Sequence, residues 1–456
     1  MKQSYSCRHL CTVLILMASS VFFSCKKALE QYNPGGLTAE SVFLDPQGFE
    51  TLVNGAYSYQ RWWYGKTEGM MLSEMGTDIW NQGNAADDPG LTNYINLESI
   101  DEYITETWER LYSGINLCNY GITNIDQAGL AENLKNIREG ELRFLRAFYY
   151  WHVVETWGAS PMPVTPTDRI ITDVHKSPVD SIYKQIFEDL DFARNNVPLT
   201  TKDFGRVTKP AVEAFLARMY LTRGLNQQAF DMADHVIKDY RFSLLSDYAA
   251  LWPMSNMANA ISKEVIYSVN YTKNLSLNDL ENKLSFPYGH GRAGNNTHMI
   301  FIIVYDKLPG MMGTLEYGGP FNRIMVTRSL LNLYNDEIDA RYDGTFLSVW
   351  KCNNTSTAPA GMKIGDTAVY CTNKIVSPEF RSDKLYQIYD LNDVYNPDGT
   401  VKDYRVSVQL KKFMDETRPS TNEQQSSRDF FVIRLPEMYL IAAEAQFKLG
   451  NASKAA

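Results

Sequence analysis

Residues 141–168 read ELRFLRAFYYWHVVETWGASPMPVTPTD, and this stretch decides the fold that we predict. Bulky side chains fall on nearly every side of a helix over its first half, and Gly158 with the Pro161/Pro163 pair ends the helix. A helix that is apolar almost all round has to be buried between other elements. The stretch therefore predicts a central helix inside a stack of helices.

An internal repeat indicates how the neighbouring helices pair. It consists of small residues at the same spacing in two copies: Ala217, Gly224 and Ala229, and then Ala443, Gly450 and Ala455. Small residues at these intervals match the tetratricopeptide pattern, in which they let two antiparallel helices approach closely. The region between the copies has mixed signals. We therefore predict a mostly α fold, with tetratricopeptide-like helical pairs interrupted by a large irregular α/β insertion.

The predicted organisation has five parts. They are a signal peptide at 1–24, a lipidated tether at 25–36, a helical region with tetratricopeptide-like pairs at 37–242, an irregular insertion with short strands and loops at 243–431, and the start of a last helix pair at 432–456, which the sequence leaves incomplete. The length of 456 residues is ample for a large core.

The N-terminus is typical of an exported lipoprotein. Basic residues precede an apolar run at 10–23, and Ser24 then stands directly before Cys25. A small residue before a cysteine at the end of such a run resembles a bacterial lipobox, which predicts that Cys25 carries a lipid. No later run approaches the ~20 apolar residues that span a bilayer. The alternative is an ordinary secreted protein with a stray cysteine.

Composition and cysteine spacing limit the partners. The chain has 44 Lys and Arg against 53 Asp and Glu, which gives a net charge of −9, and no basic stripe, so nucleic acid is not an expected partner. Cys352 and Cys371 flank a loop-like stretch, and a disulfide between them is plausible in an oxidising compartment. Cys118 is expected to be a buried apolar residue. No cysteine spacing suggests zinc.

Several motifs resemble those of the SusD/RagB family of outer-membrane nutrient-binding lipoproteins. The central stretch is similar to the family pattern E-x-R-F-L-R-A-F-x-Y-x-x-L, followed by a Gly and a Pro. The other matches are Asn54-Gly55-Ala56-Tyr57 at the end of the opening helix, Thr327 before the Asp339/Arg341 element, and Arg434-Leu435-Pro436-Glu437 at the start of the last helix, where Pro436 replaces the usual Ala. Together they cover nearly the whole chain.

The resemblance implies a function. Family members capture ligands at the cell outer membrane, lipid-anchored and displayed on the surface, and pass oligosaccharides, or sometimes peptides, to a SusC-like TonB-dependent transporter. The family is not catalytic, and we expect no cofactor and no metal. The alternatives are a peptide-binding uptake lipoprotein and a surface scaffold that binds proteins through its tetratricopeptide-like face.

Ligand contacts are expected from aromatic side chains on loops, because flat rings stack on sugar faces. Trp80 and Asn81 follow Thr77-Asp78, as a Trp and an Asn do in the starch-binding member of the family. The resemblance therefore implies a ligand site at Trp80 and Asn81.

Two further sets of candidates follow. Tyr317 and Phe321, with Arg323, fall near the second aromatic contact of that starch-binding member. Trp62 and Trp63 follow the first helix, and packing at the helix end or contact with the transporter are the alternatives there.

An enzyme is the competing class of function. A glycoside hydrolase needs two carboxylates, and Asp87/Asp88 or Glu437/Glu444 could supply them, although any acidic protein offers such pairs. The sequence contains no H-E-x-x-H and no G-x-S-x-G, so we predict no catalysis. Residues 390–399 are faintly calcium-like, with two Asx-rich turns as the favoured alternative.

Overall fold

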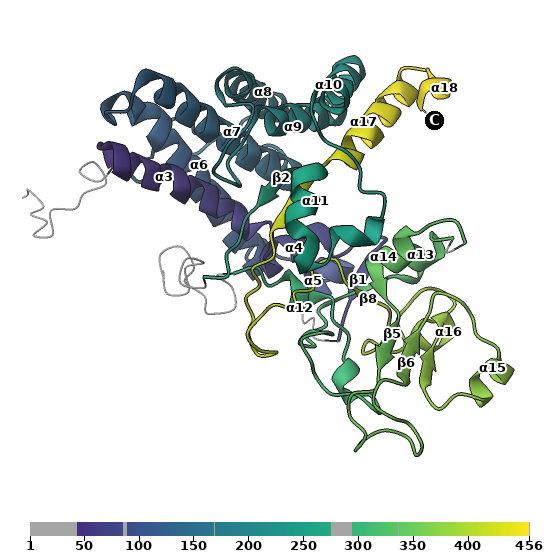
Figure 1. The fold of residues 1–456 in the computed structure, drawn as a ribbon. Helices are drawn as coiled ribbons and strands as arrows, with labels where there is room; N and C mark the ends of the chain where they lie inside the picture. Colours follow the sequence, from purple (N-terminus) through teal and green to yellow (C-terminus); the bar gives the residue numbers. More distant parts are fainter. Residues whose placement is uncertain (1–42, 85–88, 168, 275–293, 336, 456) are drawn as a thin grey trace, which may run out of the picture.

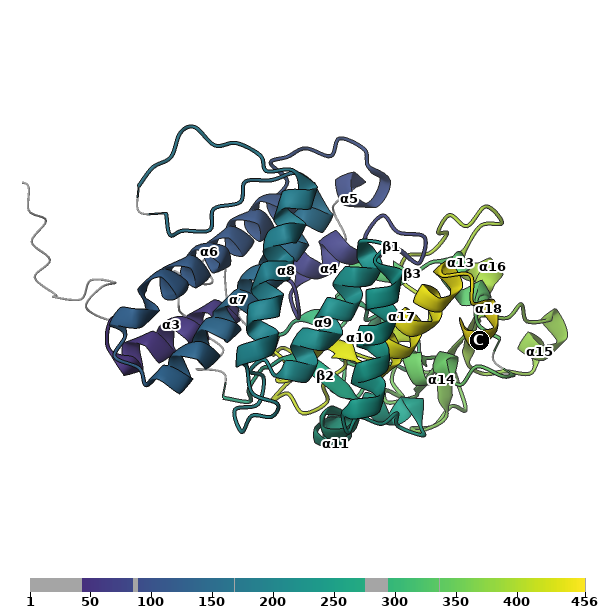
Figure 2. The same cartoon turned by 90° about the horizontal axis from the view of Figure 1, so that it is seen from above.

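The computed structural model describes residues 43–84, 89–167, 169–274, 294–335 and 337–455. The fold is mostly helical, as predicted, with one layer of long helices above an irregular α/β part (Figure 1). In spatial order the layer contains α3 (Pro46–Ser58), α6 (Glu102–Asn124), α7 (Glu132–Trp157), α8 (Val179–Asn196), α9 (Lys209–Thr222), α10 (Asn226–Asp239) and α17 (Leu435–Lys448). Figure 2 shows these helices side by side.

Helix α7 is the predicted central helix. Nearly all its side chains between residues 140 and 154 are buried. It ends at Gly158, whose φ of 70° lies in the left-handed region that glycine adopts without strain. His152, buried to 3 % exposure, contacts the Phe148 carbonyl oxygen and the Tyr64 hydroxyl. Burial lowers the pKa of His152 to about 3, so its imidazole is neutral at physiological pH.

The two repeat copies have the same turn geometry. The backbone N–H of Gly224 donates to the Leu221 carbonyl at 3.0 Å, and that of Gly450 donates to Phe447 at 3.0 Å. Both glycines have positive φ, 70° and 82°. Helix α17 packs against α10, although the whole insertion separates them in the sequence. The insertion therefore interrupts one continuous stack of helices.

The α/β part is built from short strands in small sheets. They are β1 (Trp80–Gln82) with β3 (Ile324–Val326), β2 (Val265–Val269) with β9 (Phe430–Arg434), β4 (Phe346–Leu347) with β8 (Gln409–Leu410), and β5 (Val349–Lys351) with β6 (Thr367–Cys371) and β7 (Gln387–Tyr389). All pairs are antiparallel except β6 with β7. The short helices are α4 (Thr67–Glu74), α5 (Pro89–Asn93), α11 (Met257–Lys263), α12 (Thr297–Ile300), α13 (Arg328–Asn332), α14 (Arg341–Thr345), α15 (Pro378–Ser382), α16 (Leu391–Val394) and α18 (Ala452–Ala455).

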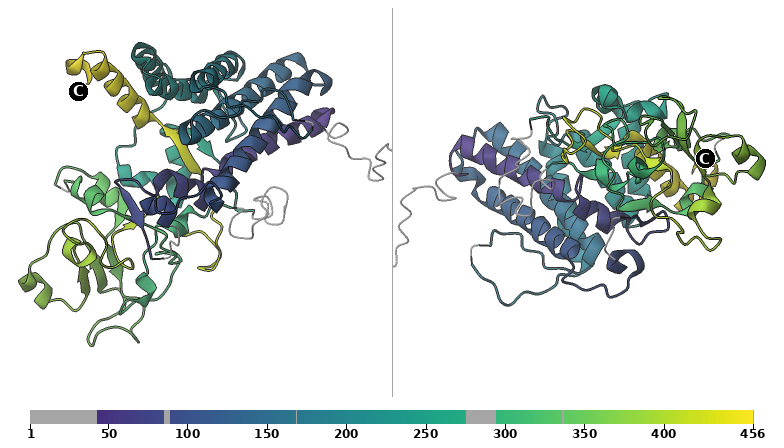
Figure 3. Two further views of the ribbon diagram at one scale, coloured as in Figure 1. Left: turned by 180° about the vertical axis from the view of Figure 1, so that it is seen from behind. Right: turned by 90° about the horizontal axis from the view of Figure 1, so that it is seen from below.

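Two hydrophobic cores support the fold. The first lies within the helical layer and includes β2, and the second lies within the α/β part and includes α4 and the start of α6. Phe430 packs against both cores. Figure 3 shows from behind that the layer of long helices lies above the α/β part, and α4 contacts α6 of that layer. The two cores therefore do not follow the order of the chain. Helix α4 precedes most of the helical layer in the sequence but packs in the core of the α/β part, and β2 belongs to the insertion but packs in the core of the helical layer.

No helix in the described part of the chain has the length and apolarity needed to cross a membrane. The predicted signal peptide, Cys25 and the tether lie outside the described residues.

The predicted disulfide is wrong, because Cys352 and Cys371 are both free thiols. The ladder between β5 and β6 explains this. The backbone N–H of Cys371 donates to the Ser348 carbonyl, so Cys371 lies across from Ser348, while Cys352 is four residues further along the opposing strand. Four residues of strand span about 13 Å, whereas a disulfide needs Cα atoms within about 7 Å. Cys118 is fully buried, as predicted.

Candidate functional site

Strands β1 and β3 bring together residues that are far apart in the sequence. Trp80 pairs with Val326 and Gln82 with Ile324, and the N–H of Gly83 donates to the Arg323 carbonyl at 2.8 Å. The segment that holds Phe321 and Arg323 therefore lies directly beside the segment that holds Trp80 and Asn81. We call this region the β1–β3 surface.

Trp80 is held in place but is only half-buried. Its ring contacts Phe301 with centroids 4.9 Å apart, and its backbone N–H donates to the Thr77 hydroxyl at 3.3 Å. Burial raises the pKa of the neighbouring Glu74 carboxyl, and hydrogen bonding from Ser73 and from the Trp80 side chain opposes that rise. A half-exposed indole can stack on a sugar ring, and a carboxylate beside it can accept hydrogen bonds from the hydroxyls of that sugar.

A row of aromatic rings connects Trp80 to the central helix. The row is Trp80, Phe301, Phe413, Phe430, Tyr64 and His152, with successive centroids 4.9, 5.7, 5.2, 5.3 and 5.5 Å apart. Such distances are those of favourable ring pairs. The indole is therefore supported by a packed interior that crosses both cores.

Asn81 does not share the face of Trp80, because successive side chains of a strand point to opposite faces. Its Oδ1 accepts a hydrogen bond from the Gln82 backbone N–H at 2.9 Å. Asn81 therefore stabilises the local backbone rather than extending the surface of the indole.

Arg323 is fixed by two rings. Its Nη1 donates to the Tyr103 hydroxyl at 2.7 Å, and its guanidinium carbon lies 4.7 Å from the centroid of Phe321. Phe321 itself is 38 % exposed. The Arg323–Phe321 pair thus offers an exposed ring and a positioned cation close to β1, which are groups that suit a polar, ring-containing ligand.

Tyr317 is not available as a stacking platform. The ring is 4 % exposed, its hydroxyl accepts the Lys351 backbone N–H at 2.9 Å, and it packs edge-on against Tyr305. The implied role of Tyr317 as a ligand contact is therefore wrong in this structure, where it is a core residue that anchors β5.

Trp62 is buried and Trp63 is half-buried, and both pack against neighbouring side chains, which is one of the alternatives for this pair. Trp62 is 1 % exposed and lies against Arg110, whose guanidinium carbon is 4.7 Å from the ring centroid. Trp63 packs edge-on against His152 at 4.5 Å.

Sequence reasoning missed Tyr94, which is 66 % exposed and follows α5. Its hydroxyl donates to the Gly76 carbonyl at 3.1 Å, beside the loop that leads to Trp80. Its φ is 57°, a strained value for a bulky residue, and such strain is found preferentially at functional positions. Nothing in the local sequence marks a tyrosine for this conformation.

Glu437 and Glu444, two of the candidate catalytic carboxylates, are each paired with a basic side chain. Both oxygens of Glu437 accept hydrogen bonds from Arg218 at 2.6 and 2.8 Å, and Glu444 is ion-paired with Lys448. Asp87 and Asp88 lie outside the described residues.

The candidate calcium segment forms a helix cap. Asp390 and Asp393 make a capping box at the start of α16, and Asp390 also pairs with Arg381. Within the described ranges, no group of three or more His, Cys, Asp or Glu side chains is arranged to hold a metal ion.

These features define a helical-repeat protein that presents aromatic side chains on an inserted α/β part. Comparison with family models agrees: residues 43–221 match a model described as "starch-binding associating with outer membrane", and residues 263–456 match the model of the SusD family. The chain belongs to the SusD/RagB family.

Relatives with curated names carry the same family name. A SusD-like protein of Formosa agariphila is 28 % identical over 257 residues, which are 54 % of this chain and 50 % of the relative. A SusD-like protein of Bacteroides ovatus is 22 % identical over 268 residues, which are 54 % of this chain and 47 % of the relative. The chain thus spans about half the length of the curated relatives it matches.

Solved structures share the fold. A laminarin-binding SusD-like protein superposes with a TM-score of 0.63 at 20 % identity, covering 88 % of this chain and 80 % of that one. Surface glycan-binding protein A from Bacteroides fluxus gives a TM-score of 0.63 at 17 % identity, covering 88 % and 76 %.

Proposed function

We propose that this protein binds oligosaccharides at the β1–β3 surface and delivers them to a SusC-like TonB-dependent transporter in the cell outer membrane. The observation that carries the proposal is the supported, half-exposed ring of Trp80 next to Glu74. Family membership supports it, as do the names of structural neighbours, which bind laminarin or surface glycans. The named relatives are binding proteins, and the carboxylate contacts described above give no support to hydrolysis.

The proposal includes a lipid anchor on Cys25 that holds the protein on the cell surface. Changing Cys25→Ser is expected to move the protein from the membrane fraction to the soluble fraction and to abolish palmitate labelling, since the thiol is the acceptor of the lipid. Lys26→Ser, at the neighbouring position, is the control and should remain in the membrane fraction. A labelled, membrane-bound Cys25→Ser variant would contradict the anchor.

Loss of the indole should weaken glycan binding. We expect Trp80→Ala to raise the Kd for the tightest-binding oligosaccharide at least about tenfold, equivalent to ~1.4 kcal/mol, because the stacking face is removed. The measurement is calorimetric titration of residues 26–456 against polysaccharides, oligosaccharides and peptides. Trp80→Phe keeps the contact with Phe301 and should lie between Trp80→Ala and the parent.

Phe380→Ala is the matched control, because Phe380 is also a large exposed aromatic residue, at 45 % exposure, on α15. It should leave the Kd unchanged. Equal glycan affinity in Trp80→Ala and the parent would refute the position of the site. A folded protein that binds no saccharide, but retains peptides or a protein partner, would favour peptide uptake or a scaffold role instead.

A further inference from the structure

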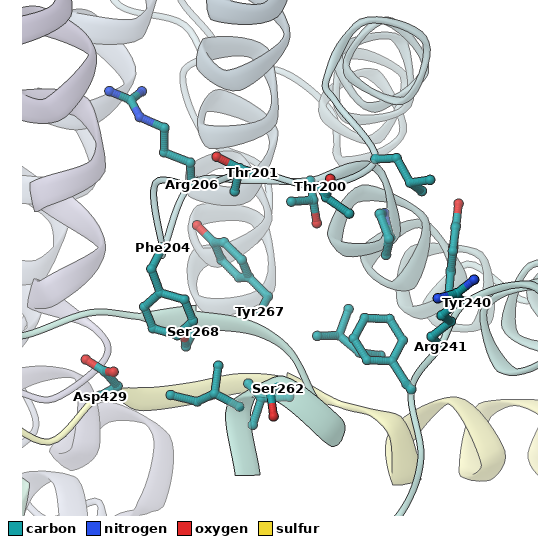
Figure 4. Close-up of a pocket in the computed structure, with 18 of the residues that line it drawn as sticks. Thr200, Thr201, Phe204, Arg206, Tyr240, Arg241, Ser262, Tyr267, Ser268 and Asp429 are labelled. Atoms are coloured by element: carbon teal, nitrogen blue, oxygen red, sulfur yellow. The ribbon is translucent and has the colours of Figure 1, made fainter. Parts of the chain in front are cut away.

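A cavity of about 960 Å³ lies away from the β1–β3 surface, between the helical layer and α11 (Figure 4). Its walls are the loop between α8 and α9, the segment that follows α10, and α11, and its floor is strand β2. Volumes of ~300–1,000 Å³ are typical of ligand sites. We call this cavity the β2 groove.

Strand β2 has a free edge. Among the described residues its sheet has two strands, β2 and β9, so β2 is paired on one side. Within the part of the chain that the structure describes, the backbone hydrogen bonds of residues 265–269 go to β9 alone. A free strand edge presents a row of unpaired N–H and C=O groups, which can accept another strand.

The groove runs along that edge. Val265, Ile266, Tyr267 and Ser268 all line it, and the pairing with β9 shifts register between Val265 and Tyr267 and again between Tyr267 and Ser268. Because four consecutive residues contact the cavity, the groove extends along the strand. Figure 4 shows Tyr267 and Ser268 on β2 beneath the loop that carries Phe204.

The walls of the groove are mainly apolar and carry balanced charge. Phe204 and Leu199 are 55 % and 56 % exposed, and Phe242, Met257 and Ile261 complete the apolar lining. Two arginines and two aspartates also line it: Arg206, Arg241, Asp239 and Asp429. Arg206 is already ion-paired with Glu50 and Glu141. The groove therefore suits an uncharged occupant with apolar side chains.

One end of the groove carries an additional acceptor. Asp429 Oδ1 accepts the Tyr271 backbone N–H at 2.8 Å. Asp429 is only 8 % exposed, and burial raises the pKa of its carboxyl to about 6. The Asp429 carboxyl therefore adds a mostly buried acceptor to the wall of the groove.

We propose that the β2 groove binds an extended, uncharged peptide segment that adds to β2 as a third strand. Its backbone pairs with the free edge of β2, and its apolar side chains, at alternate positions, contact Phe204, Phe242 and Ile261. The five residues of β2 extend for about 17 Å, which matches a segment of about five residues. This mode of recognition takes affinity from main-chain hydrogen bonds and selectivity from the pockets for side chains.

The test uses an acetylated, amidated hexapeptide of alternating valine and threonine. Two further forms of this peptide are N-methylated on alternate amides: in the first form the methyl groups lie along one edge of the extended peptide, and in the second form they lie along the opposite edge. Since N-methylation removes N–H donors from a single edge, one form should bind at least tenfold more weakly than the parent peptide and the other about as well. The measurements are calorimetric titration and NMR detection of slowed amide exchange in residues 265–269.

A protein variant locates the contact. Phe204→Ser should weaken the parent peptide about tenfold, whereas Phe380→Ser, which changes an exposed phenylalanine outside the groove, should not. The proposal is overturned if a folded protein does not bind the peptide, or if both N-methylated forms bind equally. Glycan titration of the same samples tests the β1–β3 surface separately, so failure of either site is recognised independently.

Discussion

Replacing Asp189 by alanine is expected to lower the free energy of unfolding by about 3–5 kcal/mol, because it leaves a buried guanidinium without its counter-charge. Asp189 is fully buried on α8, and its carboxylate receives two hydrogen bonds from Arg146, Nε to Oδ2 at 2.8 Å and Nη2 to Oδ1 at 2.7 Å. Arg143 and Gln185 also donate to Oδ1. The charge of Arg146, which is 3 % exposed, would then remain unpaired inside the helical layer.

The loss should extend beyond α8. Nη1 of Arg146 donates to Asn119 on α6, and Asn119 donates to the carbonyls of Pro163 and Thr165. The same network therefore joins three helices and fixes the proline-rich loop that follows α7. We expect that loop to lose amide protection together with the global stability, as measured by hydrogen exchange.

Chemical denaturation provides the main measurement, with Asp180→Ala as the matched control. Asp180 is on the same helix and pairs with Arg223, but its side chain is 88 % exposed, so its removal should cost less than about 1 kcal/mol. Asp189→Asn keeps one acceptor and should lie between the two. A loss below 1 kcal/mol for Asp189→Ala would show that Arg146 finds another partner.

The motif residues could be recognised in the sequence, but their roles could not. In the deciding stretch, Glu141 pairs with Arg138 and Arg206, and Arg146 pairs with Asp189. In the last motif, Arg434 pairs with Glu264 and Glu437 with Arg218. Apart from Glu141–Arg138, which lies within α7, these ion pairs join different elements, so helical periodicity predicts the helices while the partners depend on the three-dimensional stack.

The candidate site was predictable only in part, for reasons of strand geometry. The segments that hold Trp80 and Arg323 lie side by side because β1 pairs with β3. No local sequence pattern predicts a strand pairing across more than 240 residues. Tyr317 is buried, because a position near the second aromatic contact of the starch-binding member does not show whether a ring belongs to the core or is exposed for stacking. The disulfide failed because spacing in the sequence does not give the register between β5 and β6.

Gly69→Ala is expected to lower the free energy of unfolding by about 3 kcal/mol and to weaken glycan binding at the same time. A Cβ at Gly69 would lie 2.1 Å from the carbonyl oxygen and 2.4 Å from the Cα of Trp63, which are backbone atoms that cannot rotate away. Helix α4 would have to shift, and it leads directly through Thr77 to Trp80. Because Met70 and Met71 are buried in the second core, that shift also disturbs the packing beneath the β1–β3 surface.

The matched control for this change is Gly313→Ala, since a Cβ at Gly313 meets nothing within 4 Å. Thermal unfolding and glycan titration of both variants separate the effects of backbone entropy from those of the clash. If Gly69→Ala lost stability but kept the parent affinity for glycan, the position of Trp80 would not depend on α4, and the ligand site would have to be supported by β3 and the aromatic row alone. Joint loss of stability and binding instead means that one close backbone contact, between α4 and Trp63, determines the geometry of the ligand surface.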